Sequence, residues 1–294
     1  MTPVSYTTPS VAIPESGQAM IEVAMGDDSE SWEIARRLVA ARLGAYAEPL
    51  YPGSRPPTLE AGYAVQDAAI ALWPSRIMGW KVGRIPDEWA ARMGEERLVG
   101  PIFEASIRIA DAGAPAVFPA ISGGFAAVEA EFVFRIGRDA PRGKIAWTDE
   151  EALGHVDALH IGVELAGSPL PDINDLGPAV VVSDFGNNAG LIVGPAIRDW
   201  RRVLDEDMVC ACEVDGSLAG RGSASGIHGG LAAALRFALA RCARRGMPLL
   251  AGQWVSTGAA TGIHEVRSGQ RARALFDGVG AIEVRVATAQ PRSV

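Results

Sequence analysis

The sequence is poor in cysteine, has no long apolar run and carries no excess of basic residues. Its 294 residues include three cysteines and no Cys-x-x-Cys pair, which argues against a disulfide framework and a zinc site. No apolar stretch reaches the roughly 18 residues that a membrane-spanning helix needs. The net charge of −8 argues against nucleic acid as a partner, because phosphate binding needs a basic surface. We expect a cytoplasmic protein that binds neither membranes nor nucleic acids.

What remains is an ordinary globular composition behind an unusual start. Apolar residues make up 48% of the chain and charged residues 21%, which suits a protein with a sizeable core. Residues 1–19 are rich in Pro, Ser and Thr, and they lack the basic start and apolar core of a signal peptide. We expect a disordered leader over residues 1–25, a helical region over 26–99 and a β-rich domain over 100–294.

Helix signals dominate the region 26–99. Asp28 or Ser29, and then Thr58, are placed to cap two amphipathic helices. A short strand is expected at 77–82, and Pro86 opens a further short helix.

Strand signals dominate the rest of the chain. Strands are expected at 101–109, 126–136, 158–165, 178–184, 190–194, 207–214, 252–257, 270–276 and 281–287. Two helices interrupt them: one begins at the capping box Thr148–Glu151 and runs to about residue 159, and the other covers about 230–245. Asp215-Gly216 and Asp277-Gly278 are typical of hairpin turns. Strands and helices do not alternate regularly, which argues against a doubly wound sheet or a (β/α)8 barrel.

Two glutamates stand out in the alternating segment 126–136. Side chains on a strand repeat every two residues, so Glu129 and Glu131 lie on one face, roughly 7 Å apart at Cα. Like charges this close repel, and a strand keeps them only beside a cation or with one raised pKa. The alternative is a solvated face of an antiparallel strand, and it stays open at this point.

A third carboxylate, Glu164, lies in the apolar run 160–165, where a charge is costly unless it has a partner. Three hard oxygen ligands without Cys or His favour Mg2+ or Mn2+ over zinc. The sequence therefore predicts a divalent metal site at Glu129, Glu131 and Glu164.

Lys81 is the second residue that points to chemistry. It lies in the apolar segment Gly79–Gly83, where burying an ammonium group requires an anionic partner. The glycines on either side allow close approach of a ligand. The alternative is a lysine on an edge strand whose charged end reaches solvent.

Three weaker signals follow. Asp184 ends an apolar run before a Gly/Asn turn, and it is either a turn residue or an acceptor for metal-bound water. The loop 255–262 is rich in glycine and hydroxyl groups that suit a carboxylate, but it matches no P-loop or dinucleotide motif. The isolated histidines are interpreted as structural or surface residues: His160, His228 and His264.

Together these motifs resemble the 2-keto-4-pentenoate hydratase group of the fumarylacetoacetate hydrolase superfamily, from about residue 30 to 288. The resemblance rests on their order and spacing: Tyr63-Ala-Val-Gln66, Gly79-Trp-Lys-Val-Gly83, Glu129-Ala-Glu131, Val163-Glu164-Leu165, Val182-Ser-Asp184, Arg245-Gly-Met-Pro-Leu249, Ser256-Thr-Gly258 and Phe276-Asp-Gly-Val-Gly280. It implies an α+β fold, a mixed β-roll of the superfamily's C-terminal-domain type beside a smaller helical region, and a homo-oligomer.

The resemblance also implies roles for individual residues. Glu129, Glu131 and Glu164 are the implied ligands of Mg2+ or Mn2+. Lys81 is the implied acid/base or carboxylate partner, with a pKa lowered by burial and tuned by the acids around it. Asp184 is a second catalytic candidate, and four residues are candidates for substrate binding: Tyr63, Gln66, Thr257 and Gly258.

The implied reaction is metal-dependent addition of water to a 2-oxo-4-enoate, in its 2-hydroxydienoate form, to give a 4-hydroxy-2-oxo acid in the catabolism of aromatic meta-cleavage products. The same enolate suits decarboxylation of a 2-oxo-3-enedioate, or cleavage of an acylpyruvate C–C bond with a His–Glu pair that the sequence does not identify. A non-catalytic binder of small acids is the alternative from another class.

Two departures from the family pattern leave the substrate open. The turn Ala166-Gly-Ser-Pro169 lacks the arginine common in relatives of the hydratase kind, and Phe185 follows Asp184 where asparagine is more usual.

Overall fold

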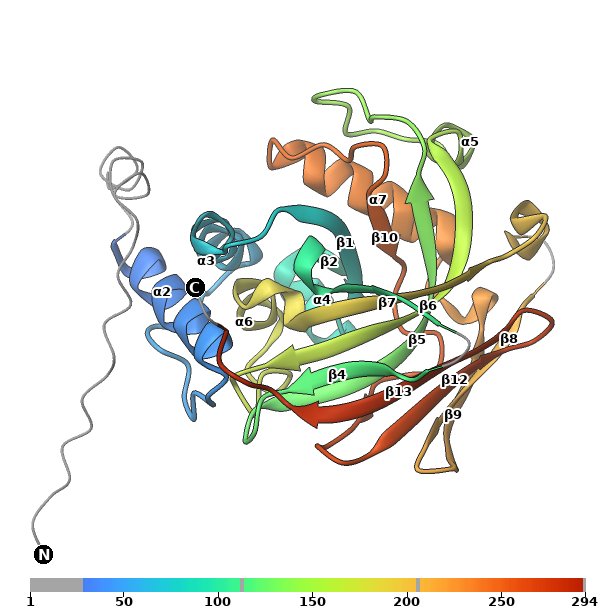
Figure 1. Cartoon of the computed structure of the whole chain (residues 1–294). Helices are drawn as coiled ribbons and strands as arrows, with labels where there is room; N and C mark the ends of the chain where they lie inside the picture. Colours follow the sequence, from blue (N-terminus) through green and yellow to red (C-terminus); the bar gives the residue numbers. More distant parts are fainter. Residues whose placement is uncertain (1–28, 112–113, 205–206, 293–294) are drawn as a thin grey trace, which may run out of the picture.

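The computed structural model describes residues 29–111, 114–204 and 207–292, and the expected leader at 1–25 lies outside this part of the chain. Two sheets form the body of the protein, and helices pack at one side and along one face (Figure 1). The strands are β1 Ile77–Arg84, β2 Arg97–Phe103, β3 Ile107–Ile109, β4 Ala116–Ala120, β5 Phe125–Ile136, β6 Val156–Ser168, β7 Asn188–Ala196, β8 Val209–Val214, β9 Ser217–Ser223, β10 Trp254–Ser256, β11 His264–Glu265, β12 Arg271–Phe276 and β13 Gly280–Thr288. The α-helices are α2 Ser29–Gly44, α3 Leu59–Leu72, α4 Asp87–Met93, α5 Asp149–Leu153, α6 Pro178–Ser183 and α7 Gly230–Arg244.

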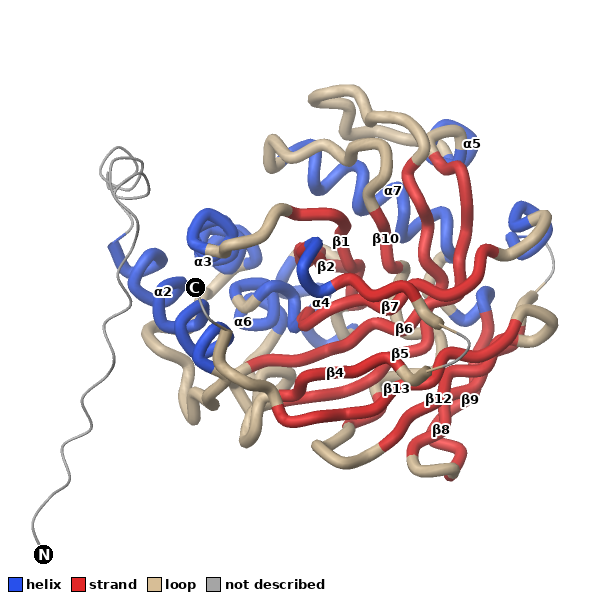
Figure 2. The backbone as a smooth tube through the Cα atoms, viewed as in Figure 1, coloured by secondary structure: helices blue, strands red, loops and turns tan. Residues whose placement is uncertain are grey.

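The larger sheet has eight strands in the order β2-β1-β10-β5-β6-β7-β3, with β11 paired to β5. The smaller sheet has five strands in the order β4-β13-β12-β8-β9. Figure 2 shows that strands dominate the centre of the molecule, while the helices lie around it. The mixed α+β fold with an N-terminal helical part confirms the fold class that the resemblance implied.

The long pair β5 and β6 is the centre of the larger sheet because its residues are apolar on both faces. Phe132, Phe134 and Ile161 are fully buried, and Phe132 meets Phe276 of the smaller sheet edge to face at 5.5 Å between ring centroids. The core therefore lies between the two sheets. α7 covers it from outside, with Leu231, Leu235 and Leu239 four residues apart on the buried face.

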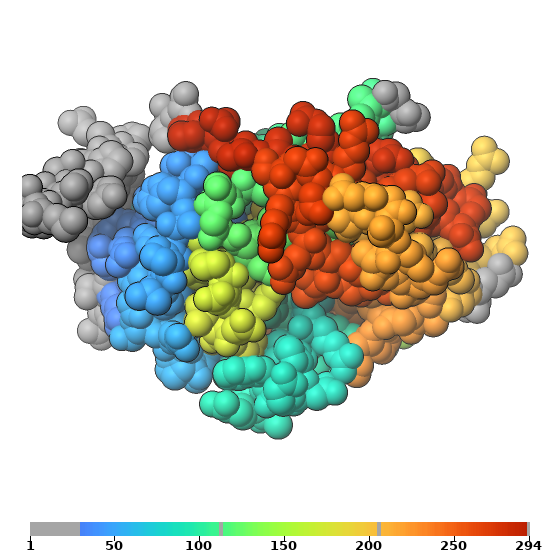
Figure 3. All heavy atoms as spheres, turned by 90° about the horizontal axis from the view of Figure 1, so that it is seen from below, coloured from blue at the N-terminus to red at the C-terminus, as the bar shows by residue number. Residues whose placement is uncertain are grey.

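The N-terminal helices form a second, smaller core. The side chain of Thr58 accepts a hydrogen bond from the backbone of Ala61 and caps α3, as the sequence predicted. Figure 3 shows these helices (blue) at one side of the molecule and the residues of β8 and β9 (orange) toward the other. β1 and the first three residues of β2 belong to the expected helical region 26–99, but both strands lie in the larger sheet. The boundary at residue 100 stays a prediction.

The expected strand at 178–184 is wrong, because this segment is the helix α6. The valine run favours a strand, but Pro178 occupies the first helical turn, where its fixed φ suits a helix and its missing N–H costs nothing. The amide of Gln66 donates to the carbonyl of Val182 and anchors the helix to α3.

The expected helix from Thr148 to about residue 159 is much shorter than predicted. The capping box of Thr148 and Glu151 is present, but α5 ends at Leu153 and β6 begins at Val156. The β-branched and aliphatic run 156–165 is stabilised by pairing with β5 rather than by helix propensity.

The expected strand at 101–109 is broken into β2, a 3-10 turn at Glu104–Ser106 and β3, which pairs with a different strand. Three strands were not predicted, because they are short or contain Pro or Gly: β4, β9 and β11. Both Asp-Gly hairpins are present, with Gly216 and Gly278 at positive φ. None of the helices in the described ranges is long and apolar enough to cross a membrane.

Candidate functional site

The three glutamates that the sequence singled out converge at the centre of the larger sheet. Glu129 and Glu131 alternate along β5, and the register of the antiparallel pair places Glu129 directly opposite Glu164 on β6. Each residue offers a carboxylate oxygen, and these oxygens lie within 4.8 Å of one another. Glu131 and Glu164 are fully buried and Glu129 is 5% exposed, so this is not the solvated strand face that the sequence left open.

The electrostatics of this acidic cluster favour a bound cation. Burial, together with the nearby Glu164 carboxylate, raises the pKa of Glu129 to about 8. Burial and the two neighbouring carboxylates also raise the pKa of Glu131 well above its usual value. One oxygen of Glu131 and one of Glu164 are buried without a hydrogen-bond partner. Two orphaned hard oxygens among three close carboxylates fit a divalent cation such as Mg2+ or Mn2+.

Lys81 supplies one positive charge to the cluster. β1 lies between β2 and β10, so Lys81 pairs with Gly100 on one side and with Ser256 on the other. Its Nζ lies 3.1 Å from a carboxylate oxygen of Glu164, which also accepts from the amide of Asn188 at 3.1 Å. The anionic partner that the sequence demanded for Lys81 is therefore Glu164.

The pKa predicted for Lys81 is wrong in direction. Burial acts to lower the pKa of Lys81, but Glu164, Glu129 and Glu131 outweigh it and leave the pKa raised. Lys81 is thus an ammonium group in the protein without metal. The sequence predicted that the glycines on either side of Lys81 give a ligand room to approach. At Gly79 the reason is different, because a side chain there would collide with the backbone of Trp254.

The Ser-Thr-Gly loop binds a carboxylate of the protein itself. Ser256 Oγ and the backbone N–H of Gly258 both donate to Glu131 Oε2, the latter at 2.9 Å. Thr257 Oγ1 donates to the carbonyl of Phe132 at 2.8 Å. Thr257 and Gly258 line the pocket described below, but their donors hold β5 and Glu131 in place.

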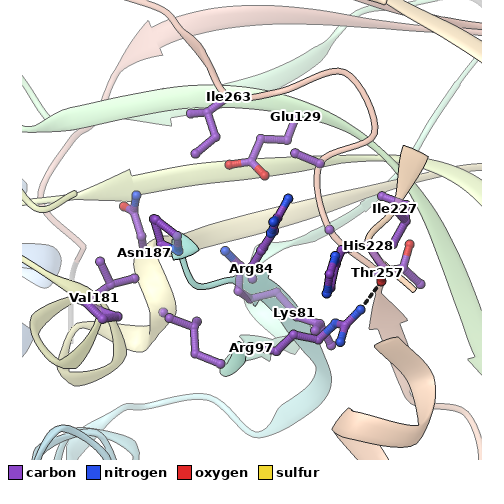
Figure 4. Close-up of a pocket in the computed structure, with 18 of the residues that line it drawn as sticks. Lys81, Arg84, Arg97, Glu129, Val181, Asn187, Ile227, His228, Thr257 and Ile263 are labelled. Atoms are coloured by element: carbon purple, nitrogen blue, oxygen red, sulfur yellow. Dashed lines mark hydrogen bonds between the residues drawn. The ribbon is translucent and has the colours of Figure 1, made fainter. Parts of the chain in front are cut away.

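A pocket of about 370 Å3 opens above the acidic cluster, a volume that suits a small-molecule ligand. Lys81, Glu129, Thr257 and Gly258 line it, whereas Glu131 and Glu164 lie beneath its wall. Figure 4 shows further polar side chains around the same space: Arg84, Arg97, Asn187 and His228.

Sequence reasoning missed these four residues, because β1, β2 and two distant loops bring them together. No local signal was available for Arg84, because side chains three positions apart on a strand point to opposite faces, and the predicted strand ended at residue 82. His228, interpreted from the sequence as structural or surface, lies in the pocket wall, with its Nε2 3.1 Å from Glu96 Oε2.

Tyr63 and Gln66 do not line the pocket. The hydroxyl of Tyr63 accepts from the backbone N–H of Val99 at 3.0 Å, and Gln66 donates to the carbonyls of Val99 and Val182. Both residues are buried, and both attach α3 to β2, the strand beside Lys81. Their role in substrate binding stays a prediction, and their observed contacts support the strands beside the pocket.

Asp184 also lies away from the pocket lining. Its carboxylate accepts from Arg42 Nε at 2.5 Å and from Ser168 Oγ at 2.5 Å. Arg42 donates as well to the carbonyls of Gly167 and Asn188. The turn after Glu164, whose sequence lacks an arginine, therefore receives one from α2.

Asp184 is followed directly by a strained stretch of backbone that reaches the site. Phe185, Gly186 and Asn187 all have positive φ, which is costly for the two residues with side chains. A side chain at Gly100 would lie 2.0 Å from the carbonyl oxygen of Phe185, so the strained stretch packs directly on the strand opposite Lys81. The stretch ends at Asn187, which lines the pocket, and the next residue, Asn188, donates a hydrogen bond to Glu164.

Comparison with known proteins finds similarity in structure but not in sequence. No protein-family model matches the chain, and no curated protein sequence matches it. Among solved structures, 4-oxalocrotonate decarboxylase from Pseudomonas putida G7 matches with a TM-score of 0.73 and 18% identity, covering 89% of this chain and 99% of that one. That enzyme was solved with calcium and acetate and also with magnesium and adipate.

A second similar structure is fumarylpyruvate hydrolase from Pseudomonas aeruginosa in complex with Mn2+ and pyruvate. It matches with a TM-score of 0.53 and 21% identity over 74% of this chain and 91% of that one. At these identities the comparison establishes the fold. The chain therefore has the fold of these two metal-bound enzymes.

Proposed function

We propose that this protein is a divalent-metal-dependent enzyme that acts on a 2-oxo acid through its enolate, with addition of water to a 2-oxo-4-enoate as its reaction. The observation that carries the proposal is the buried cluster of Glu129, Glu131 and Glu164, with Lys81 in contact, at the base of a ligand-sized pocket. A non-catalytic binder of small acids would gain nothing from three buried carboxylates that repel its ligand.

Glu129, Glu131 and Glu164 would hold the ion, and Mg2+ or Mn2+ suits their oxygen donors. The structurally similar enzymes are described in complex with magnesium and with Mn2+, which supports this choice. When bound, such an ion supplies a Lewis acid for the carboxylate and 2-oxo oxygens of the substrate. Ser256 and Gly258 fix the orientation of Glu131 for that purpose.

Lys81 is the proposed proton-transfer residue. It is the cationic side chain in contact with the cluster, and it lines the pocket. As an ammonium group it donates a proton or a hydrogen bond to the substrate at Nζ, and its neutral form takes a proton back. Glu164 contacts its Nζ, and the backbone at Gly186 passes so near that an added Cβ there would lie 3.3 Å from its Cδ. The side-chain oxygen of Asn187, which is buried without a hydrogen-bond partner, is available as a further polar contact.

Asp184 is a positioning residue in this proposal rather than a catalytic one, because it touches Arg42 and Ser168 and not the pocket. Tyr63 and Gln66 have the same kind of role through β2 and α6. The place of the reaction in the catabolism of aromatic meta-cleavage products, and a homo-oligomeric state, are part of the proposal.

Decarboxylation of a 2-oxo-3-enedioate is the second candidate. Arg84 and Arg97 in the pocket wall favour it, because its substrate carries a second carboxylate. The similar decarboxylase bound to adipate, a dicarboxylate, agrees with this.

Cleavage of an acylpyruvate ranks lower. The pair of His228 and Glu96 would be its water-activating pair, but their side chains are 42% and 67% exposed at the pocket rim.

The test is a paired assay with Mg2+ or Mn2+. One reaction follows loss of ultraviolet absorbance from 2-hydroxypenta-2,4-dienoate, and the other follows carbon dioxide release from 2-oxo-3-hexenedioate. Metal-dependent loss of the dienoate that disappears in Glu131→Gln, and persists in the exposed control Glu283→Gln, is the expected result. Carbon dioxide release without hydration would show that the reaction is decarboxylation, the second candidate, and not hydration. Metal-independent turnover, or turnover unchanged in Glu131→Gln, would contradict the proposal.

A further inference from the structure

The pocket has a second polar region, separate from the acidic cluster, at the far end of β1. The antiparallel register of β1 and β2 places Arg84 directly opposite Arg97, and both line the pocket. Two like charges at opposed positions of a strand pair destabilise it. An anion beside the two arginines would compensate this repulsion. Among the described residues, Asp87 forms an ion pair with Arg84 at 2.8 Å, and no carboxylate forms one with Arg97.

Arg97 is the buried member of the pair. It is 9% exposed, whereas the side chain of Arg84 is 53% exposed. Its guanidinium donates to the backbone carbonyl of His228, and within the described ranges no carboxylate lies within 4 Å of it. The neighbouring Glu96 is the closest candidate, but its carboxylate is in contact with His228. A guanidinium has five donors, so most of those of Arg97 remain for a ligand.

Burying a cation without an ionic partner is unfavourable, and the electrostatics show the cost. Burial lowers the pKa of Arg97, and the positive charges of Arg236 and Arg84 lower it further, against the opposing effect of Glu96. A bound carboxylate would satisfy both the free donors and the charge, because carboxylate and guanidinium bind in a two-pronged, charge-assisted geometry.

The spacing of the two ends fits one extended small molecule. Arg84 lies three residues beyond Lys81 on β1, which separates the two levels by about 10 Å at roughly 3.3 Å per residue. Apolar side chains line the wall of the same pocket, which suits a carbon chain between two charged ends: Val181, Ile227 and Ile263 (Figure 4).

We propose that Arg97, assisted by Arg84, binds a second carboxylate of the substrate, so that the enzyme prefers dicarboxylic 2-oxo acids and turns over monocarboxylic ones, such as 2-hydroxypenta-2,4-dienoate, more slowly. This inference rests on the proposed function, because it takes the acidic cluster and Lys81 to bind the 2-oxo acid end. Arg97 is then a specificity-determining residue. Its role is the same whichever bond of the substrate the enzyme changes.

The experiment compares two unreactive ligands of equal chain length, 2-oxoadipate and 2-oxohexanoate, which differ in a terminal carboxylate. Their affinities for the Mn2+-loaded full chain are measured by calorimetry, with and without the metal. We expect 2-oxoadipate to bind at least about tenfold more tightly, which corresponds to about 1.4 kcal/mol. In Arg97→Gln this preference should be lost while the affinity for 2-oxohexanoate changes little.

Two further variants make the result specific. Arg97→Lys keeps the charge and loses the fork geometry, so it should retain part of the preference. Arg273→Gln removes an exposed arginine from the smaller sheet, outside the pocket lining, and should retain all of it. Far-ultraviolet circular dichroism of each variant establishes that it is folded.

Each outcome separates this inference from the proposed function. Equal, metal-dependent binding of both ligands by the natural protein would overturn the inference and leave the proposed function intact. A preference that survives in Arg97→Gln would overturn the assignment to Arg97. Failure of both ligands to bind with Mn2+ present would overturn the proposed function, and the inference with it.

Discussion

Replacing Glu129 by glutamine should make the metal-free protein more stable at alkaline pH, which is the opposite of what removal of a buried polar contact usually does. The folded, metal-free chain keeps a proton on Glu129 up to about pH 8, because burial and Glu164 raise its pKa from 4.5 to about 8. The unfolded chain releases that proton near pH 4.5. Unfolding therefore releases a proton between these two pH values, and the free energy of unfolding falls as the pH rises through this window.

The magnitude follows from the same two values. One proton corresponds to about 1.4 kcal/mol per pH unit, and the gap between 4.5 and about 8 amounts to about 5 kcal/mol. Glutamine has the shape of the protonated acid and does not titrate. Glu129→Gln should therefore match the natural protein near pH 5 and exceed it by up to about 5 kcal/mol at pH 8. The attraction between Glu129 and Lys81, which the variant loses, reduces that gain.

The assay is urea unfolding of chelator-treated protein at several pH values between 5 and 8, followed by circular dichroism. Glu283→Gln, an exposed carboxylate on the smaller sheet, is the control and should leave the pH slope unchanged. With Mn2+ present the order should reverse, since the natural protein gains stability by binding the ion and the variant does not. A variant that is less stable than the natural protein at pH 8 without metal, or that keeps the full pH slope, would refute the reasoning.

Three more predictions concern the site and its supports. The affinity for Mn2+ should rise at least about tenfold per pH unit between about pH 5 and 8, because the ion displaces the Glu129 proton and competes with the proton that the raised pKa of Glu131 retains. Calorimetry in two buffers counts the protons released, and a pH-independent affinity would contradict this. Gly100→Ala should destabilise the fold by about 1–3 kcal/mol or more in thermal unfolding, since its Cβ would lie 2.0 Å from the Phe185 carbonyl oxygen. The control Gly226→Ala should be close to neutral, because its Cβ would meet only Ser223, at 3.8 Å. Arg42→Leu should lower the free energy of unfolding in urea by about 3–5 kcal/mol, because Asp184 is left buried and unpaired. The control Arg36→Leu, at an exposed ion pair, should lower it by less than about 1 kcal/mol. Equal effects of the two variants would show that the buried pair is not needed for stability.

The acidic cluster was accessible from the sequence because its signal is local. Alternation along 126–136 places Glu129 and Glu131 on one face whatever lies beside the strand, and a charge in the run around Glu164 is anomalous on its own. The structure adds what no local pattern contains, namely the register that sets Glu129 opposite Glu164. Capping residues are equally local, so the start of α3 at Thr58 was predicted correctly.

The wall of the pocket was not accessible in this way. Arg97 and His228 are far apart in sequence, and each is unremarkable in its own segment. They meet because β2 pairs with β1 and because the loop before α7 folds over it. The direction of the pKa of Lys81 was wrong for a related reason. Burial of one lysine is visible from its neighbours in sequence, but the summed field of three carboxylates from two other strands is not.

Segments where propensity and tertiary structure disagree account for the remaining errors. The valines of 178–184 favour a strand, yet packing on α3 and the proline at the first turn make a helix. The acidic segment after Thr148 favours a helix, but the residues from Val156 onward pair with β5 and form the strand β6. Asp184 was predicted to end a strand, as a turn residue or as an acceptor for metal-bound water, and it follows helix α6 and pairs with Arg42.

The most direct test of the account is the stoichiometry of Mn2+ binding to the full chain, measured by electron paramagnetic resonance of the free ion. The account predicts one tightly bound ion per chain in the natural protein, and loss of that site in both Glu131→Gln and Glu164→Gln. The exposed control Glu283→Gln should bind as the natural protein does. Binding that survives in both cluster variants, or no binding to the natural protein, would contradict the claim that these three buried carboxylates form a metal site.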